Sequence, residues 1–176
     1  MRALTLIRPM SSAVVHGTKR IENRPQNLPK AMRGVSTIVA VHAGKGWDAD
    51  YSQAVIRIDG QKKYTTTSAF TDEGIVGLMC LTGRMYTHRD VRDYNTNSPQ
   101  RDNNDYDIKR QYMVDGIDVD AMLTDWYSGT FGYEISMAIA FPKPIPCRGM
   151  LGFWTVPDDV FAQFDHATLE RTLEWR

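Results

Sequence analysis

The stretch from residue 17 to residue 24 reads GTKRIENR, and we interpret the rest of the chain from this octet outward. It follows a short segment, residues 9–16, whose apolar spacing predicts a helix. If the second half of the octet is extended, alternate side chains share a face, so Glu22 and Arg24 point the same way. Lys19 then lies at the bend between helix and strand. Such a group can hold a phosphate, a base edge or a polarised carbonyl, or it can form a plain surface ion pair.

The rest of the sequence predicts an α+β fold in one domain over residues 1–176. We expect strands at residues 3–7, 35–43, 75–82, 129–146 and 149–156, and helices at residues 9–16, 49–58 and from 157 onward. Short strands separated by Gly and Pro are typical of a small mixed β-barrel, here flanked by helices and followed by a C-terminal helix. Residues 86–125 are polar and rich in Asn, and we interpret them as an insertion between barrel strands. This insertion could be a lid, a specificity loop or padding.

The formal net charge of the chain is zero, which argues against a protein that coats nucleic acid without specificity. The charge is unevenly distributed, however. Residues 1–47 contain eight basic side chains and one acid, Glu22, for a net charge of +7 that the rest of the chain balances. This basic quarter can present an anion-binding face, unless the fold interleaves it with acidic side chains.

Several classes of protein are not expected from this sequence. No apolar run approaches the length of a membrane span, and the N-terminal apolar stretch is short for a secretory signal. Cys80 and Cys147 are far apart, and no Cys/His pattern predicts zinc or another metal. Cys80 lies in an apolar strand and is expected to be a buried thiol. We therefore expect a cytoplasmic protein with no metal and no cofactor. The sequence leaves the oligomeric state open between a monomer, which we favour, and an oligomer.

Further ligand-binding candidates follow the predicted strand at residues 35–43. His42 and Lys45 lie where that strand ends, at the expected mouth of the barrel. Trp47 follows and can stack on a base or sit at the edge of the core. His42 is either a ligand contact or a structural histidine. Trp126 and Tyr133, near the end of the insertion, are additional stacking candidates.

The pattern Gly-x-Lys-x-x-Glu-x-Arg after an amphipathic helix resembles the signature of the ASCH domain, named for activating signal cointegrator homology. This family belongs to the PUA-like superfamily of small β-barrels. Other segments match the family in the expected order, namely Leu4–Pro9, Val39–Lys45, Gly74–Leu78, Phe131–Ile135, Pro144–Pro146 and Arg148–Trp154. The match covers residues 3–84 and 126–157. The resemblance implies that the chain folds as a PUA-like barrel.

The resemblance also implies a function linked to RNA, namely binding of a nucleotide or single-stranded nucleic acid without a membrane partner. Lysine and arginine side chains would hold phosphates or base edges, a glutamate would orient them, and a tryptophan would stack on a base. The ligand-binding residues that we predict are Lys19, Glu22, Arg24, His42, Lys45, Trp47 and Trp126.

One branch of the family hydrolyses N4-acetylcytidine with a lysine, a threonine and a glutamate, and it suggests an alternative function. Lys19 matches the branch's lysine, but Glu22 replaces its threonine. Glu73 and Glu134 are both candidates for the distal glutamate. In this alternative the protein is a hydrolase, an amidohydrolase of an acylated cytidine or a ribonuclease, with Lys19 as base and Glu22 as a second proton-transfer group. A third reading is a protein-interaction module in which the octet is structural.

Overall fold

The computed structural model describes residues 1–16, 19–47, 73–87, 127 and 130–175, and the backbone of residues 55–58, 61–64, 113–114 and 117–118. The elements in chain order, with η marking a 3-10 helix, are β1 (Arg2–Arg8), α1 (Met10–Val15), β2 (Ile21–Arg24), η1 (Lys30–Met32), β3 (Thr37–Trp47), β4 (Val55–Ile58), β5 (Gln61–Tyr64), β6 (Gly74–Thr87), β7 (Met113–Val114), β8 (Ile117–Asp118), β9 (Phe131–Ile145), β10 (Phe153–Thr155), α5 (Asp158–Phe161), α6 (His166–Arg171) and η4 (Thr172–Trp175). The fold is α+β, as the sequence predicts.

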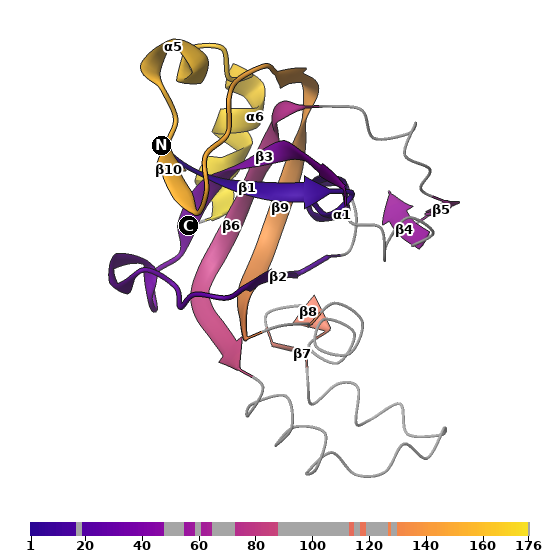
Figure 1. Cartoon of the computed structure of the whole chain (residues 1–176), viewed down its shortest axis with the longest axis vertical. Helices are drawn as coiled ribbons and strands as arrows, with labels where there is room; N and C mark the ends of the chain where they lie inside the picture. The colour runs from indigo at the N-terminus through magenta and orange to yellow at the C-terminus, as the bar shows by residue number, and fades with distance from the viewer. Residues whose placement is uncertain are drawn as a thin grey trace.

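One mixed sheet of six strands organises the molecule, in the order β10-β1-β3-β6-β9-β2 (Figure 1). Strands β1 and β3 are parallel, and every other neighbouring pair in this sheet is antiparallel. The two edges are β10 and β2, so the strand pairings do not close the sheet into a barrel. The pairs β4–β5 and β7–β8 form separate two-stranded sheets.

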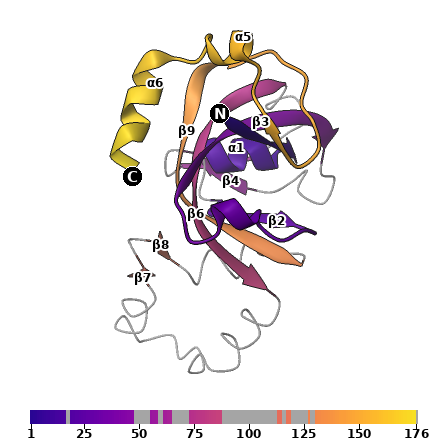
Figure 2. The ribbon, with the colours of Figure 1, turned by 90° about the vertical axis from the view of Figure 1, so that its left-hand side faces the viewer.

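The sheet separates two apolar cores, because alternate residues of a strand point to opposite faces. In β1, Leu4 and Leu6 enter the first core, whereas Ala3 enters the second. Helix α1 covers the first face and the C-terminal helices cover the second (Figure 2). The burial of both faces explains why residues 74–81 of β6 are all buried, as expected for an apolar run without alternation.

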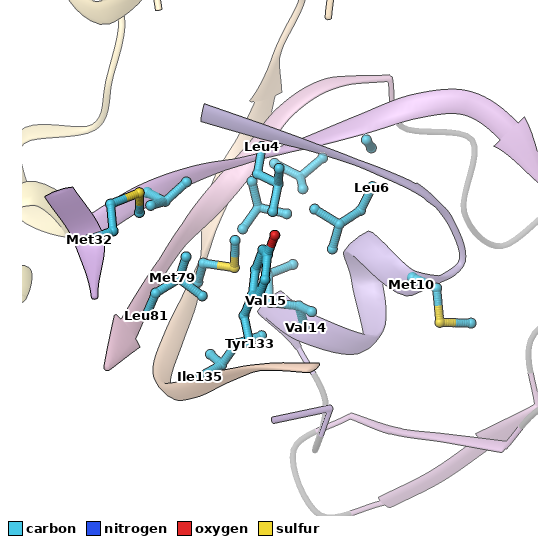
Figure 3. Close-up of a cluster of buried hydrophobic side chains, with 14 of the residues drawn as sticks. Leu4, Leu6, Met10, Val14, Val15, Met32, Met79, Leu81, Tyr133 and Ile135 are labelled. Atoms are coloured by element: carbon cyan, nitrogen blue, oxygen red, sulfur yellow. The ribbon is translucent and has the colours of Figure 1, made fainter. Parts of the chain in front are cut away.

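The first core includes Tyr133 of β9, which lies among the aliphatic side chains of β1, α1 and β6 (Figure 3). Its ring stacks on Phe153 with a centroid distance of 6.1 Å. The Tyr133 hydroxyl donates a hydrogen bond of 2.8 Å to the carbonyl of Gln26. This contact fastens the loop after β2 to the core.

The second core packs Val160 and Phe164 of the C-terminal region against the sheet. The Phe141 and Phe164 rings meet edge to face with centroids 5.0 Å apart. Asp165 interrupts this helical region, as the sequence suggests, and caps α6 by accepting a 2.8 Å hydrogen bond from the backbone N–H of Thr168.

The helix predicted over residues 49–58 is wrong where it can be checked. Residues 55–58 form strand β4, which pairs with β5 from Val55↔Tyr64 to Ile58↔Gln61. Residues 49–54 lie outside the described residues. The sequence contains the signal that was missed, because β-branched residues in β4 precede Asp59-Gly60, a dipeptide typical of two-residue hairpins. The last strand, predicted from residue 149, begins only at Phe153.

Candidate functional site

Strand β2 carries the second half of the octet along the edge of the sheet, where it pairs only with β9. Glu22 is directly opposite Tyr133 in this pairing, so both side chains lie on the face of the first core. Arg24, two residues along, shares that face as the sequence predicts. Gly17 and Thr18, the first residues of the octet, lie outside the described residues.

Lys19, Glu22 and Arg24 form one connected group of charges, which we name the triad. Lys19 Nζ donates a 2.9 Å hydrogen bond to Glu22 Oε2 and a second hydrogen bond to the Ile21 carbonyl. Glu22 Oε1 lies 3.0 Å from Arg24 Nη2. Arg24 Nη2 also donates a 2.6 Å hydrogen bond to the carbonyl of Thr5 on β1. The carboxylate therefore bridges the two cations.

The triad is buried rather than a surface ion pair. Relative exposure of the side chain is 2% for Lys19 and 7% for Glu22, and it is 20% for Arg24. A buried ion pair makes little net contribution to stability, but removal of one partner leaves a buried charge and is costly. Two cations against one carboxylate leave a surplus of one positive charge in this group.

The triad also acts on Tyr133. Burial raises the pKa of the Tyr133 hydroxyl above its ordinary value; the charge of Arg24 lowers this pKa and the charge of Glu22 raises it. The tyrosine is thus within electrostatic reach of both residues and stays a neutral hydrogen-bond donor at physiological pH. Because it is buried and stacked on Phe153, it is not placed to stack on a ligand base, contrary to its expected role.

Arg24 is the member of the triad that retains unused binding capacity. Its Nη2 serves both Glu22 and Thr5, whereas its Nε is buried and has no hydrogen-bond partner within the described ranges. An unpaired buried donor costs about 1–3 kcal/mol. The side chain as a whole is 20% exposed and leaves the guanidinium partly open to a ligand. Both oxygens of Glu22 are occupied by the neighbouring cations.

His42 does not join the triad, although the sequence predicts all four residues as ligand contacts. Its neighbour Val41 points into the first core, so His42 points to the opposite face of the sheet. There it is 4% exposed and meets the Trp154 ring edge to face, with centroids 5.6 Å apart. Burial lowers the pKa of the imidazole, and the backbone contact with Cys147 and the charge of Glu73 oppose that shift less strongly.

Lys45 and Trp47 lie at the end of β3, beside Arg8 rather than in the triad. Arg8 Nη2 donates a 2.7 Å hydrogen bond to the Lys45 carbonyl, and Arg8 is the register partner of Trp47. The Lys45 side chain is exposed, and Trp47 Nε1 has no hydrogen-bond partner among the described residues. Trp126, the remaining predicted contact, lies outside the described residues.

The two candidates for a distal glutamate differ in their surroundings. Glu134 is 1% exposed on the opposite face of β9 from Tyr133, where it accepts hydrogen bonds from Thr82 Oγ1 at 2.5 Å and from the Tyr86 hydroxyl at 3.3 Å. Glu73 is exposed and lies 3.7 Å from Arg8 Nη2. Neither carboxylate contacts the triad in the described part of the chain.

Thr5 is the site residue that sequence reasoning missed. It contributes only its backbone carbonyl to Arg24, and its side chain accepts a 3.1 Å hydrogen bond from Trp154 Nε1 on the other face. A carbonyl carries no sequence signal, because every residue has one. The contact between Thr5 and Arg24 can be recognised only once the spatial arrangement of β1 and β2 is known.

A scan against protein-family models and a search of the curated proteins found no match to this chain. The resemblance of the octet and its neighbouring strands to ASCH domains therefore stays a hypothesis. The geometry of the triad has to carry the argument about function.

None of the described helices is long and apolar enough to cross a membrane. In the ranges that the structure describes, no group of three or more His, Cys, Asp or Glu side chains could hold a metal ion. Both cysteines are free thiols, and Cys80 is buried as expected.

Proposed function

We propose that this protein binds a nucleotide or single-stranded RNA at the triad, and that Arg24 is the residue that touches the ligand. The observation that carries this proposal is the state of the Arg24 guanidinium. It is fixed by Glu22 and Thr5 through Nη2, it is partly exposed, and its buried Nε lacks an acceptor in the described residues. An oxygen of a phosphate or of a nucleobase would bind to the exposed part of this guanidinium.

The charges around the triad support an anionic ligand. The triad has one surplus positive charge in a buried setting, where interactions between charges are stronger than in water. Residues 1–47, which supply the triad, Arg8 and Lys45, have a net charge of +7 from eight basic side chains and one acid. A phosphate group would be attracted to this part of the molecule.

The finer fold that we propose is a PUA-like barrel, completed by side chains rather than by strand pairing. Arg24 reaches from β2 to the Thr5 carbonyl on β1. The two strands are not neighbours in the sheet order, so this hydrogen bond spans the gap that a closed barrel would fill with a backbone ladder. The order of the ASCH-like segments along the chain supports the same interpretation.

The hydrolase alternative is less well supported by the geometry. A lysine that acts as a base needs an available lone pair on Nζ. The Lys19 side chain is 2% exposed and its Nζ donates to both Glu22 and the Ile21 carbonyl, so Nζ is not placed to receive a proton from a substrate. We infer that Lys19 positions Glu22, and through it Arg24.

The proposal is tested by calorimetric titration of nucleotides and short RNAs into the wild-type protein, Arg24→Lys and Lys143→Met. Arg24→Lys keeps the charge but loses the planar fork, so we expect affinity to fall about tenfold or more. Lys143 is an exposed cation on β9, and its replacement should leave affinity unchanged. The affinity of the wild type should fall steeply with salt if phosphate is contacted.

A readout on the wild type guards against a variant that does not fold. The Arg24 Nε–H resonance should move when a ligand is added and should report the same dissociation constant as calorimetry. An unchanged resonance under saturating ligand would overturn the assignment to Arg24. Product formation from N4-acetylcytidine or RNA during these titrations would favour the hydrolase instead.

A further inference from the structure

The connection from β9 to β10, residues 146–152, lies over His42 and forms what we name the strap. The His42 Nε2 atom is 3.2 Å from the carbonyl oxygen of Cys147 in the strap. A carbonyl only accepts hydrogen bonds, so the ring proton of neutral His42 resides on Nε2 and is donated to the strap. The second ring nitrogen, Nδ1, then has a bare lone pair.

The Nδ1 side of the ring is covered by Gly149 of the strap. A Cβ built at Gly149 would lie 2.5 Å from His42 Nδ1 and 2.8 Å from Thr5 Oγ1, so only a glycine fits here without displacement. Nδ1 is buried and has no hydrogen-bond partner within the described part of the chain. The backbone of His42 itself is the remaining group that favours a proton on the ring, and it does so less strongly than burial disfavours it.

We propose that protonation of His42 releases the strap from the sheet, so that the strap is a cover controlled by pH. A proton on Nδ1 would create a buried cation on the side of the ring that Gly149 covers. A buried charged group is costly where its partners do not replace the lost water, and displacement of the strap would admit water to the ring. Release would uncover the Thr5 hydroxyl, His42 and the Trp154 indole nitrogen.

The strap is held lightly enough to move on its own. Its Leu151 side chain is 99% exposed and its Met150 side chain is 54% exposed, so neither anchors it in a core. Cys147 packs at the margin of the second core, and the bond to His42 Nε2 fastens its carbonyl. Segments with few buried apolar contacts open locally at a small cost in free energy.

The other charged groups around His42 do not offset the cost of burying a charged ring. Glu73 favours the protonated form electrostatically, but Glu73 is exposed and lies 3.7 Å from Arg8. Burial raises the pKa of the Cys147 thiol, which therefore stays neutral near pH 6. Lys45 on β3 and Arg148 in the strap are exposed cations, which accept no proton from the ring.

The direction of the pH response follows from burial of the neutral ring. Burial lowers the pKa of His42 below its ordinary value of 6.5, so the closed strap is favoured above pH 6.5 and disfavoured as the pH falls. One unit below the ordinary value, at pH 5.5, the open fraction should increase by up to about tenfold.

Hydrogen–deuterium exchange of the strap amides at pH 7.5 and 5.5, corrected for intrinsic exchange rates, tests this proposal. In the wild type, protection of the strap should fall by up to about tenfold while β3 and β6 stay protected. His42→Gln can still donate to Cys147 but cannot take a proton, so its strap should stay protected at both pH values. His166→Gln alters a side chain that is 88% exposed and should keep the wild-type response.

Three outcomes would overturn the proposal. These are equal protection of the wild-type strap at both pH values, a pH response that persists in His42→Gln, and a parallel loss of protection in β3 and β6. If His42→Gln does not fold, a nuclear magnetic resonance titration of the wild type decides. The strap amides must then shift with the same midpoint as the His42 ring, and a different midpoint would reject the idea.

Discussion

Arg24 Nη2 lies 2.6 Å from the carbonyl oxygen of Thr5, and this contact joins two strands that are not neighbours in the sheet. Strand β1 pairs with β10 only from Arg2 to Leu4, so the carbonyl of Thr5 lies just past the end of that pairing. Arg24 supplies the donor that a neighbouring strand would otherwise provide. The Arg24 guanidinium thus links two strands and is also the proposed ligand contact.

Replacement of Arg24 should therefore reduce stability as well as binding. Arg24→Met removes a charged donor from the Thr5 carbonyl and from Glu22, and we expect a loss of roughly 1.5–3 kcal/mol in the free energy of unfolding. Urea denaturation of the variant and of Lys143→Met, an exposed control expected within about 0.5 kcal/mol of wild type, measures the difference. If Arg24→Met lowers the free energy of unfolding no more than the control does, the contacts of Arg24 do not stabilise the fold.

Removal of the carboxylate from the triad should be more damaging than removal of the whole triad. Glu22→Gln leaves Lys19 and Arg24 buried beside a neutral amide, at a cost of roughly 3–5 kcal/mol. The triple variant Lys19→Met, Glu22→Leu, Arg24→Met buries no charge at these positions and should lose less stability than Glu22→Gln. Denaturation curves of both proteins provide the comparison. The opposite order would mean that the ion pairs themselves stabilise the fold.

A methyl group at position 149 should strain the contact between the strap and His42. In Gly149→Ala the new Cβ would lie 2.4 Å from His42 Cε1, so the ring or the strap must shift, at a cost of about 1–3 kcal/mol. Leu151→Ala changes a fully exposed strap residue and should be nearly neutral. Thermal unfolding of both variants tests this. In a His42→Ala background the cost of Gly149→Ala should shrink, and an unchanged cost would place its cause elsewhere.

Stability should decrease on acidification over the range where histidine titrates. The lowered pKa of buried His42 means that its contribution is complete above pH 6.5 and is lost as the pH falls towards the folded-state pKa. The loss at pH 5.5 should be no more than about 1.4 kcal/mol, and release of the strap would keep it below this limit. Denaturation of wild type and His42→Gln at pH 7.5 and 5.5 measures the difference. An identical pH dependence in both proteins would remove His42 as its source.

The sequence predicts the local geometry of the octet well, because the strand period alone places Glu22 and Arg24 on one face. The helix-to-strand bend at Lys19 also agrees, since α1 ends at Val15 and β2 begins at Ile21. The same period could have separated His42 from the triad, because Val41 beside it is an apolar residue of the first core. Its expected place at the barrel mouth came from strand ends and not from strand faces.

Other features of the site depend on contacts between distant segments. Arg24 meets a backbone carbonyl on β1, and Gly149 is required by the His42 ring on β3. The sequence pattern within one segment does not predict a contact with another segment that is distant in the chain. The helix predicted at residues 49–58 follows the spacing of apolar residues. The β-branched residues and the Asp59-Gly60 dipeptide favour a strand instead, and residues 55–58 form β4.

The pairing of β1 with β10 has a consequence for synthesis on the ribosome. Arg2 and Thr155 are 153 positions apart in the chain, yet they are partners in the sheet. Since translation proceeds from the N-terminus, β1 cannot pair with β10 until nearly the whole domain has emerged from the ribosome. Until Trp154 and Phe164 emerge, the second core lacks its covering side chains, so a nascent chain stalled before β10 presents a bare apolar sheet face to chaperones.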